Sequence, residues 1–278
     1  MTNYSITVAE YAKNEHYNNT MVYSGYYGTG EERLTYTINV LKSDNELIVV
    51  DTGYDVTQEE AARHEAAESI TNFKNPVDVL KRIGVDPLEV KHVILTHAHW
   101  DHMGGISFFP NAKFYLQKDE LLNWINIMAK SPEYGTLKTP MSYSNLEEAV
   151  GLIKEGRLIL LDGDVEQLLP GIDIKVARFG HSFAQNLVYV NTINGRYILS
   201  GDTAYVKENF VGVNGSGVSL PNGFAIGSII NTITTMQDML KDVNGDTSKI
   251  IIGHDDKMWQ DYKSVQYEDS LHVAYIVE

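Results

Sequence analysis

The sequence predicts a mixed α/β protein, because short apolar segments typical of strands alternate with longer segments of helical periodicity. Residues 93–95 form an apolar run that predicts a buried strand, whereas residues 118–129 space their apolar side chains as a helix does. The composition, 43% hydrophobic and 21% charged, is that of an ordinary globular protein. A chain of 278 residues can form one large core or two fused halves. We expect a single domain over residues 1–278.

The expected strands are short and are bounded by polar or glycine-containing turns. Asn194-Gly195 is a strong signal for a hairpin turn between two of them. In chain order the expected strands are 36–41, 46–50, 93–95, 112–116, 157–161, 172–177, 186–191, 196–200 and 249–252, the last of the chain.

The expected helices cover residues 59–69, 77–83, 118–129 and 146–153. In the third of them we expect one apolar face, made by Leu121, Leu122, Ile125 and Met128. Trp124 lies off that face, and packing in the core or at the surface is favoured over contact with a partner or a pocket.

Three other segments are candidates to border a substrate pocket. The aromatic N-terminal region, to about Tyr36, favours a strand with packed rings, and the alternative is that 23–30 is a loop reaching the pocket. Residues 131–144 are rich in Pro, Gly, Ser and Tyr, which predicts an irregular excursion, either a lid or a plain surface loop. The aromatic tail, 255–278, is a third candidate lid. The sequence leaves the choice open.

Charge and composition exclude several classes of function. The formal net charge of −15 argues against nucleic acid or an anionic membrane as a partner. No segment approaches membrane-spanning length, and the N-terminus shows no signal-peptide pattern, so we expect a cytoplasmic protein. The chain has no Cys, which removes disulfides, thiolate nucleophiles and Cys-bound zinc. A homodimer is left open.

The stretch from Thr96 to Gly105, THAHWDHMGG, carries the clearest chemical signal. It follows the apolar run 93–95 and holds four side chains that bind metals, His97, His99, Asp101 and His102. In an extended segment His97 and His99 point to the same side, whereas the adjacent Asp101 and His102 point apart and suit a second ion. Gly104 and Gly105 then let the chain turn sharply. Imidazole with carboxylate suits zinc and other first-row divalent ions.

This stretch resembles the H-x-H-x-D-H signature of the metallo-β-lactamase superfamily. The resemblance implies a four-layer αββα sandwich, with two sheets face to face, helices outside and metals at one edge. It implies further ligands at the ends of later strands: His181 after Gly180, Asp202 as the carboxylate between two metals, and His254 after Gly253. We expect one metal on His97, His99 and His181, a second on Asp101, His102 and His254, and Asp202 bridging them.

Two further features have counterparts in the superfamily. Asp51 in Asp51-Thr52-Gly53 suits an acceptor that orients a metal-binding histidine, with a turn-capping role as the alternative. The residues after His181 depart from the usual pattern, which continues with Pro, Gly and a further His, whereas this chain has Phe183, Ala184 and Gln185.

The segment DTAYVKENF, residues 202–210, resembles the N-acyl homoserine lactone lactonases, which are quorum-quenching enzymes. In that family the Tyr three residues after the bridging Asp contacts the substrate carbonyl, and Tyr205 has that position. His99, where a redox branch carries Glu, favours hydrolysis. The resemblance covers the chain from about Tyr36 to Asp255.

These features predict a hydrolase that opens a lactone ring. Two divalent ions, zinc first and cobalt, manganese or iron as alternatives, would provide a bridging hydroxide that attacks the ring carbonyl. Tyr205 would stabilise the oxyanion and Asp101 would pass a proton to the leaving oxygen. The N-acyl homoserine lactones are the first substrate class, and the small-molecule alternatives are a thioester, a cyclic amide or a bicyclic lactone such as 4-pyridoxolactone. From another class, a non-catalytic metal sensor remains an alternative.

Overall fold

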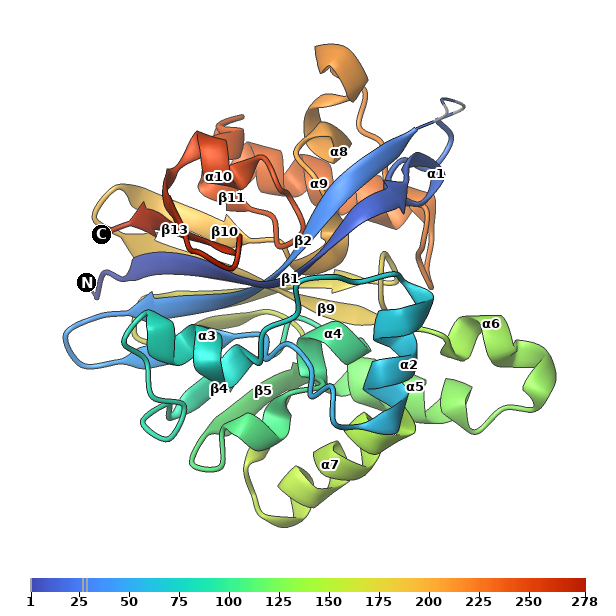
Figure 1. The fold of residues 1–278 in the computed structure, drawn as a ribbon, viewed down its shortest axis with the longest axis vertical. Coiled ribbons are helices and arrows are strands. Elements are labelled where there is room, and N and C mark those ends of the chain that lie inside the picture. The colour runs from blue at the N-terminus through green and yellow to red at the C-terminus, as the bar shows by residue number, and fades with distance from the viewer. Residues whose placement is uncertain (1, 27, 29) are drawn as a thin grey trace.

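Two β-sheets make up the centre of the computed structural model, which describes residues 2–26, 28 and 30–278. The larger sheet has the strand order β12-β13-β1-β2-β3-β4-β5-β6, and the smaller has the order β11-β10-β9-β8-β7. In Figure 1 the helices α2 to α5 and α7 gather on one side of the strands, and α8 and α9 lie on the other. This arrangement confirms the expected four-layer αββα sandwich.

The element bounds agree with most of the expected segments. The strands are β1 Ser5–Asn18, β2 Glu31–Lys42, β3 Leu47–Val50, β4 His92–Ile94, β5 Lys113–Gln117, β6 Leu158–Leu161, β7 Val165–Leu169, β8 Ile172–Arg178, β9 Ala184–Thr192, β10 Gly195–Leu199, β11 Ile250–Ile251, β12 Lys263–Gln266 and β13 His272–Val277. The helices are α1 Asn19–Val22, α2 Glu59–Ala67, α3 Pro76–Arg82, α4 Trp100–Met103, α5 Lys118–Met128, α6 Gly135–Lys138, α7 Tyr143–Lys154, α8 Glu208–Val211, α9 Ile229–Asp242 and α10 Met258–Asp261.

Alternation along the strands separates the layers, because successive side chains of a strand point to opposite faces of its sheet. In β3, Ile48 and Val50 pack between the two sheets, whereas Val49 packs on the helices outside the larger sheet. In β9, Val188 packs between the sheets and Leu187 packs on the outer side, in one cluster with residues of α9. The central strands of both sheets are therefore covered on both faces and are apolar on both sides.

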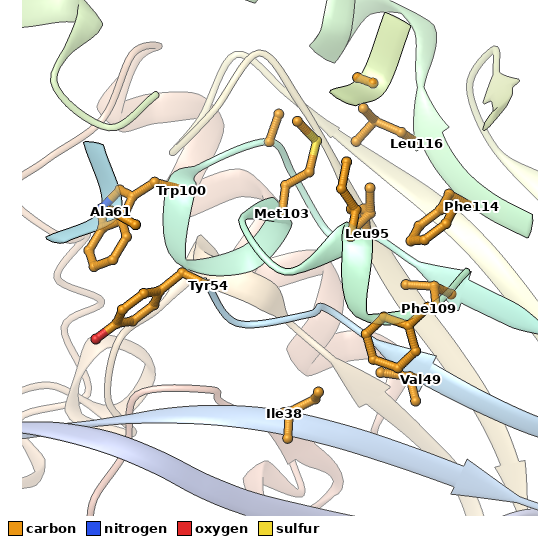
Figure 2. Packing of buried hydrophobic residues seen from close by; sticks show 14 of the residues in the cluster. Ile38, Val49, Tyr54, Ala61, Leu95, Trp100, Met103, Phe109, Phe114 and Leu116 are labelled. Carbon is orange, nitrogen blue, oxygen red and sulfur yellow. The ribbon is translucent and has the colours of Figure 1, made fainter. Parts of the chain in front are cut away.

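The short helix α4 is anchored in the core by its first and last residues. Figure 2 shows Trp100 and Met103 directed into the cluster that contains Ile38 and Val49 of the larger sheet, and both side chains are buried. The Trp100 ring lies 4.6 Å from that of Tyr54, measured between centroids. Asp101 and His102 lie between these anchors, so packing of α4 fixes the direction in which they point.

Gly104 and Gly105 are required by close packing rather than by a left-handed turn, which corrects the expectation from the sequence. Their φ angles are −71° and −111°, values that any residue adopts. A Cβ on Gly104 would lie 2.3 Å from the Trp100 carbonyl oxygen, and one on Gly105 would lie 2.5 Å from the Thr52 carbonyl oxygen. Without side chains at these two positions, the backbone that follows His102 can pack directly against the carbonyl groups of Trp100 and Thr52.

The buried face of α5 differs from the one expected. Leu122 and Ile125 are 52% and 40% exposed, whereas Trp124 is fully buried together with Leu121 and Met128. The helix is rotated so that Trp124 faces the core and the smaller aliphatic pair faces outward. Burial of the largest apolar surface outweighs the simple count of aliphatic residues on one face.

The C-terminal tail forms strands rather than a cover for the site, and 249–252 is not the last strand. After the short β11, the strands β12 and β13 make a hairpin, and β13 pairs antiparallel with β1 at the edge of the larger sheet. Trp259 and Tyr262 pack between the sheets. The alternating residues of β13 are well suited to this edge, and the N and C marks consequently lie side by side in Figure 1.

Within the described part of the chain, no helix is long and apolar enough to span a membrane.

Candidate metal centre

The candidate ligands lie just past the ends of strands that meet at one edge of the sandwich. His97, His99, Asp101 and His102 follow β4, His181 follows β8, Asp202 follows β10, and His254 follows β11. Two of these exits contain a residue in the left-handed region, Phe179 with φ 48° and Gly201 with φ 49°. These turns bend the chain sharply at the strand end, and segments far apart in sequence meet there.

The expected ligands fall into two groups whose candidate atoms lie within 4.8 Å of one another in each group. The first group is His97, His99, His181 and Asp202, and the second is Asp101, His102 and His254. The structure therefore divides the residues as the resemblance implied. That they bind metal ions stays a prediction.

Asp202 lies between the two groups, and its carboxylate is close to histidines of both. Its Oδ1 is 3.2 Å from His102 Nε2. Its Oδ2 is 3.3 Å from His254 Nε2 and 3.4 Å from His181 Nε2. A carboxylate in this position can bind two cations a few ångströms apart.

Asp101 and His102 converge, contrary to the expectation that they point apart. Asp101 Oδ2 lies 3.4 Å from His102 Nε2 and 3.7 Å from His254 Nε2. The prediction assumed an extended segment, whereas these residues belong to the helical turn α4. Adjacent helical residues are separated by about 100° rather than 180°, so both side chains can face one ion.

The fit of this cluster to metal ions is supported by buried polar atoms that have no partner among the described residues. They are the Nε2 atoms of His97, His99 and His102, together with Asp202 Oδ1. An unpaired buried polar atom is costly, and natural proteins rarely tolerate several in one place. Imidazole nitrogens and carboxylate oxygens are the ligands that zinc and related ions prefer, so cations at these atoms would satisfy them.

Asp51 contacts the cluster from outside, as its position after β3 predicted. Its Oδ2 lies 2.8 Å from His102 Nδ1, and its carboxylate also accepts the N–H and the hydroxyl of Thr96. The Thr96 hydroxyl in turn lies 2.9 Å from His97 Nδ1. Asp51 thus fixes the ring of His102 and also caps the exit from β4, so both roles considered for it apply. Such outer contacts hold the ring orientation that a metal site needs.

Backbone carbonyl oxygens fix the ring orientation of two other histidines. His254 Nδ1 lies 2.7 Å from the carbonyl oxygen of Thr35, and His181 Nδ1 lies 3.1 Å from that of Phe224. A ring that donates its Nδ1 proton outward presents the lone pair of Nε2 inward. Neither Thr35 nor Phe224 can be identified from a sequence motif, because the contact is made by the main chain.

Electrostatics of the site favour bound cations. Burial lowers the pKa of His97 and His99, with neighbouring histidines adding to the effect, so both rings stay neutral and able to bind a metal. Burial alone would raise the pKa of Asp202, but His102 and His254 hold it well below the ordinary value. The carboxylates conversely raise the pKa of His102 and His254 against the effect of burial. The negative charge that attracts those protons would also attract a divalent ion.

Glu120 connects the two loops of the first ligand group, and it was missed from the sequence. Its Oε1 accepts the Ala98 N–H at 3.1 Å, the Trp124 indole N–H at 2.8 Å and the Ser182 hydroxyl at 2.5 Å. Its Oε2 accepts the Ala184 N–H at 2.7 Å. The side chain is fully buried. A carboxylate from α5 therefore fastens the loop of His97 and His99 to the loop of His181.

Gln185 holds the turn that carries Asp202. Its Oε1 accepts the N–H of Asp202 at 3.0 Å, while its amide group donates to the Ser200 carbonyl and the Thr203 hydroxyl. Gln185, one of the residues that depart from the family pattern after His181, therefore supports the site through the turn of Asp202.

Tyr205 lines the open side of the cluster. Its ring centroid lies 5.7 Å from that of His181 and 5.3 Å from that of His254. Asn209 accepts the backbone N–H groups of Tyr205 and Val206, which explains part of the DTAYVKENF motif. Within the described residues, the Tyr205 hydroxyl has no hydrogen-bond partner, and burial raises its pKa, so it stays protonated and able to donate.

A pocket with a volume of about 290 Å³ opens onto the cluster. It is bordered by His99, Asp101, Asp202, Tyr205 and His254 from the site, and by Tyr17, Met21, Leu34, Tyr36, Ala67, Glu68, Trp100, Thr139, Pro140 and Phe224 around it. This is near the lower end of the volumes that hold small ligands.

The candidate lids differ in how they meet this pocket. The excursion 131–144 borders it through Thr139 and Pro140, and the Pro140 carbonyl accepts the Trp100 N–H at 2.9 Å. The favoured interpretation of the N-terminal region is confirmed by β1, whose Tyr17 borders the pocket, as does Met21 of α1. Of the loop 23–30, residues 27 and 29 lie outside the described part. The tail residues 255–278 do not border the pocket.

Comparison of the sequence with known proteins identifies relatives of one kind. The model of the metallo-beta-lactamase superfamily matches residues 34–254. N-acyl homoserine lactonase AiiA of Bacillus thuringiensis subsp. kurstaki is 26% identical over 183 residues, which are 62% of this chain and 64% of the relative. N-acyl homoserine lactonase AttM of Rhizobium radiobacter is 24% identical over 196 residues, 67% of this chain and 66% of the relative. The matches span just under two thirds of these relatives' lengths.

Solved structures give a likeness over nearly the whole chain. A variant of AiiA from B. thuringiensis with N-decanoyl-L-homoserine at its active site has a TM-score of 0.67 at 22% identity, covering 95% of this chain and 98% of that one. AidC, a dizinc quorum-quenching lactonase solved with a product, has a TM-score of 0.67 at 15% identity, covering 97% and 96%. At these identities the likeness establishes the fold.

Proposed function

The chain belongs to the metallo-beta-lactamase superfamily, and from this premise we propose that it is a metal-dependent hydrolase that opens a lactone ring. The N-acyl homoserine lactones are the first substrate class to consider, because the curated relatives are named for that activity. The small-molecule ring would enter the pocket bordered by Asp101, Asp202 and Tyr205.

The observation that carries the proposal is the pair of ligand groups with Asp202 between them, at the floor of a pocket. A structural metal needs a closed site of four ligands, whereas this cluster has two groups and an open side. A metal sensor would not require an accessible pocket or a protonated Tyr205 beside the ligands. The open side of the cluster therefore argues for an enzyme rather than a sensor.

His97, His99 and His181 would hold one ion, Asp101, His102 and His254 would hold the other, and Asp202 would contact both. Two divalent ions supply Lewis acidity there, which activates water and polarises a carbonyl. Zinc is the first choice, because one structural neighbour is a dizinc enzyme, and cobalt, manganese and iron suit the same ligands.

The residues of the chain orient the substrate and move the proton. We infer that the Tyr205 hydroxyl donates a hydrogen bond to the ring carbonyl oxygen, where negative charge develops when water adds. The bond between the carbonyl carbon and the ring oxygen then breaks, which leaves a carboxylate and a hydroxyl group. Asp101 would take up the proton that the attacking water releases and deliver it to the ring oxygen, because a carboxylate that binds an ion through one oxygen still has the other free.

Titration of released acid tests the proposal directly, since opening a lactone releases a proton at neutral pH. We expect the zinc-loaded protein to consume base in a pH-stat with N-acyl homoserine lactones and with simple γ-lactones. A thioester, a cyclic amide and 4-pyridoxolactone belong in the same panel. Hydrolysis of one of these alone would reassign the substrate, and no hydrolysis by protein that contains both ions would contradict the proposed function.

A further inference from the structure

Glu68 is a carboxylate of the substrate pocket that the proposed reaction does not use. It follows α2 and borders the pocket together with Asp101 and Trp100. Its backbone is fixed, because its N–H donates to the His64 carbonyl at 2.9 Å and its own carbonyl accepts from the Asn14 amide. The Tyr36 hydroxyl donates to Glu68 Oε2 at 2.7 Å. The side chain is therefore held in place at the wall of the pocket.

No cation of the protein neutralises this carboxylate. Within the described residues Glu68 makes no ion pair, and no Lys or Arg borders the pocket. Burial, with Asp101 nearby, raises the pKa of Glu68 from its ordinary 4.5 to about 7, so the carboxyl is partly protonated at neutral pH. A positive charge placed beside it would favour the ionised form. Arg33, the basic side chain of neighbouring β2, is instead engaged by Glu15 and Asp256.

The remaining wall is aromatic. Tyr17, Tyr36, Trp100, Tyr205 and Phe224 all border the same pocket. The faces of such rings attract cations, and rings gathered around a carboxylate are typical of sites that bind ammonium groups. An acyl chain alone would need neither a carboxylate nor this many rings, since aliphatic side chains would suffice.

We propose that the pocket recognises a positively charged ammonium group on the substrate, held by Glu68 and the surrounding aromatic rings. The inference rests on the proposed function, because it names the kind of lactone that the site prefers. The pocket of about 290 Å³ leaves room for a short side arm, so the cation would lie a few atoms from the ring.

Two lactones of equal shape isolate the effect of charge. α-Amino-γ-butyrolactone acylated with trimethylammonioacetate carries a permanent cation, and its analogue acylated with 3,3-dimethylbutanoate has a neutral tert-butyl group in the same place. For the zinc-loaded wild type we expect kcat/KM to be roughly tenfold higher, or more, for the charged compound. Glu68→Gln keeps an acceptor for Tyr36 but removes the charge, and the preference should then fall several-fold.

Glu65→Gln is the matched control, because Glu65 lies in the last turn of α2, just before Glu68, and also accepts a tyrosine hydroxyl, that of Tyr54, but does not border the pocket. This variant should keep the wild-type preference. Equal kcat/KM values for the two lactones in the wild type would overturn the inference, as would a preference that Glu68→Gln leaves unchanged.

Binding without turnover separates this inference from the proposed function. The ring-opened forms of both compounds can be made with base, and their affinities for zinc-loaded protein can be measured by calorimetry. Tighter binding of the charged form, lost in Glu68→Gln, supports the ammonium site even if neither lactone is hydrolysed, which would count against the lactonase proposal alone. Hydrolysis of both lactones at equal rates counts against the ammonium site alone.

Discussion

Asp202 has the most central position of any single residue in the site, since its carboxylate lies close to histidines of both ligand groups. It is held from behind by Gln185, which accepts its N–H, and by Asn222, which donates to its carbonyl at 2.7 Å. These contacts involve the backbone of Asp202 rather than its carboxylate. The carboxylate itself does not hold the turn in place, so its removal should leave the turn intact.

We expect Asp202→Ala to abolish hydrolysis while the protein keeps a cooperative thermal transition. The apolar strands build the core, whereas the carboxylate sets the relation between the two ligand groups. Rates, melting curves and metal content should be measured on the same preparation. Loss of the cooperative transition would show that Asp202 is needed for the fold, and full activity would refute its bridging role.

Tyr205→Phe tests the hydroxyl without disturbing the ring packing against His181 and His254. Loss of one oxyanion donor can cost on the order of a hundredfold in rate, but the bound ions would polarise the same oxygen. We therefore expect kcat/KM to fall roughly tenfold to a hundredfold, with metal content unchanged.

Tyr17→Phe is the control for Tyr205→Phe, because the two rings pack edge to face with centroids 6.3 Å apart in the same pocket. It should change kcat/KM much less. If Tyr205→Phe behaves like the wild type on the best lactone found, Tyr205 serves packing alone, and the main sequence argument for a lactone is lost.

Among the elements, α5 supports the first ligand group, although the helix lies in the outer layer. Glu120 projects from it to bind both the loop after β4 and the loop after β8, while the neighbouring Trp124 packs against His99 with ring centroids 5.4 Å apart. The helix thus serves as a support for the first ligand group.

Glu120→Gln places an amide N–H₂ among four donors, so at least one contact becomes repulsive. Outer contacts of this kind are typically worth about tenfold to a hundredfold in metal affinity. We expect metal titration to show weaker binding of one ion and near-normal binding of the other. Glu147→Gln on α7 is the control, and equal weakening of both ions would contradict a role confined to the first group.

A buried carboxylate of β1, that of Glu10, adds side-chain contacts to the pairing of β1 with β13. Its Oε2 accepts the backbone N–H of His272 at 2.9 Å and lies 2.8 Å from the His272 ring nitrogen Nδ1. Burial raises the pKa of Glu10 above its ordinary 4.5, and His272 and Lys13 offset part of this rise. The folded chain therefore holds this proton at pH values where the unfolded chain has lost it.

An acid whose pKa is higher in the folded than in the unfolded protein contributes to stability at pH values below its pKa in the unfolded chain. That contribution is lost as the pH rises through its pKa in the folded protein. The free energy of unfolding of the wild type, relative to Glu10→Gln, should therefore decrease as the pH is raised from about 4 toward neutrality. Urea unfolding of both proteins at a series of pH values measures this difference. A difference that stays constant or increases with pH would contradict the raised pKa.

At the scale of the whole molecule, the candidate metal site lies where the two sheets meet. β3 and β4 of the larger sheet supply the neighbourhood of Asp51 and His97, and β8, β10 and β11 of the smaller sheet lead to His181, Asp202 and His254. Ions that bind all of these residues would therefore hold one half of the sandwich to the other.

We expect about two divalent ions per chain and a lower melting temperature after chelation. An ion present at about a hundred times its dissociation constant stabilises the folded state by about 2.7 kcal/mol per site. Elemental analysis and thermal melts before and after chelation measure both quantities. Zinc should restore the melting temperature and magnesium should not, because histidine ligands suit zinc. A content that never exceeds one ion under metal-replete expression would contradict the binuclear site.

The local sequence was sufficient for features that depend on neighbouring residues. Apolar runs predicted β3, β4 and β9, and the motif from His97 to His102 identified four of the seven candidate ligands. The resemblance of the chain to a known family then indicated His181, Asp202 and His254. Such features are encoded within a few residues, and strand periodicity and ligand spacing therefore remain visible in the sequence.

The tertiary structure decided what depends on contacts between distant segments. Which face of α5 is buried, where β12 and β13 pair, and how Glu120 and Thr35 support the ligands all involve residues dozens to hundreds of positions apart. Asp101 and His102 converge because α4 is helical, a state that its four residues adopt through the packing of Trp100 and Met103. Helices this short are not stable by themselves, so their geometry is set by the core against which they pack.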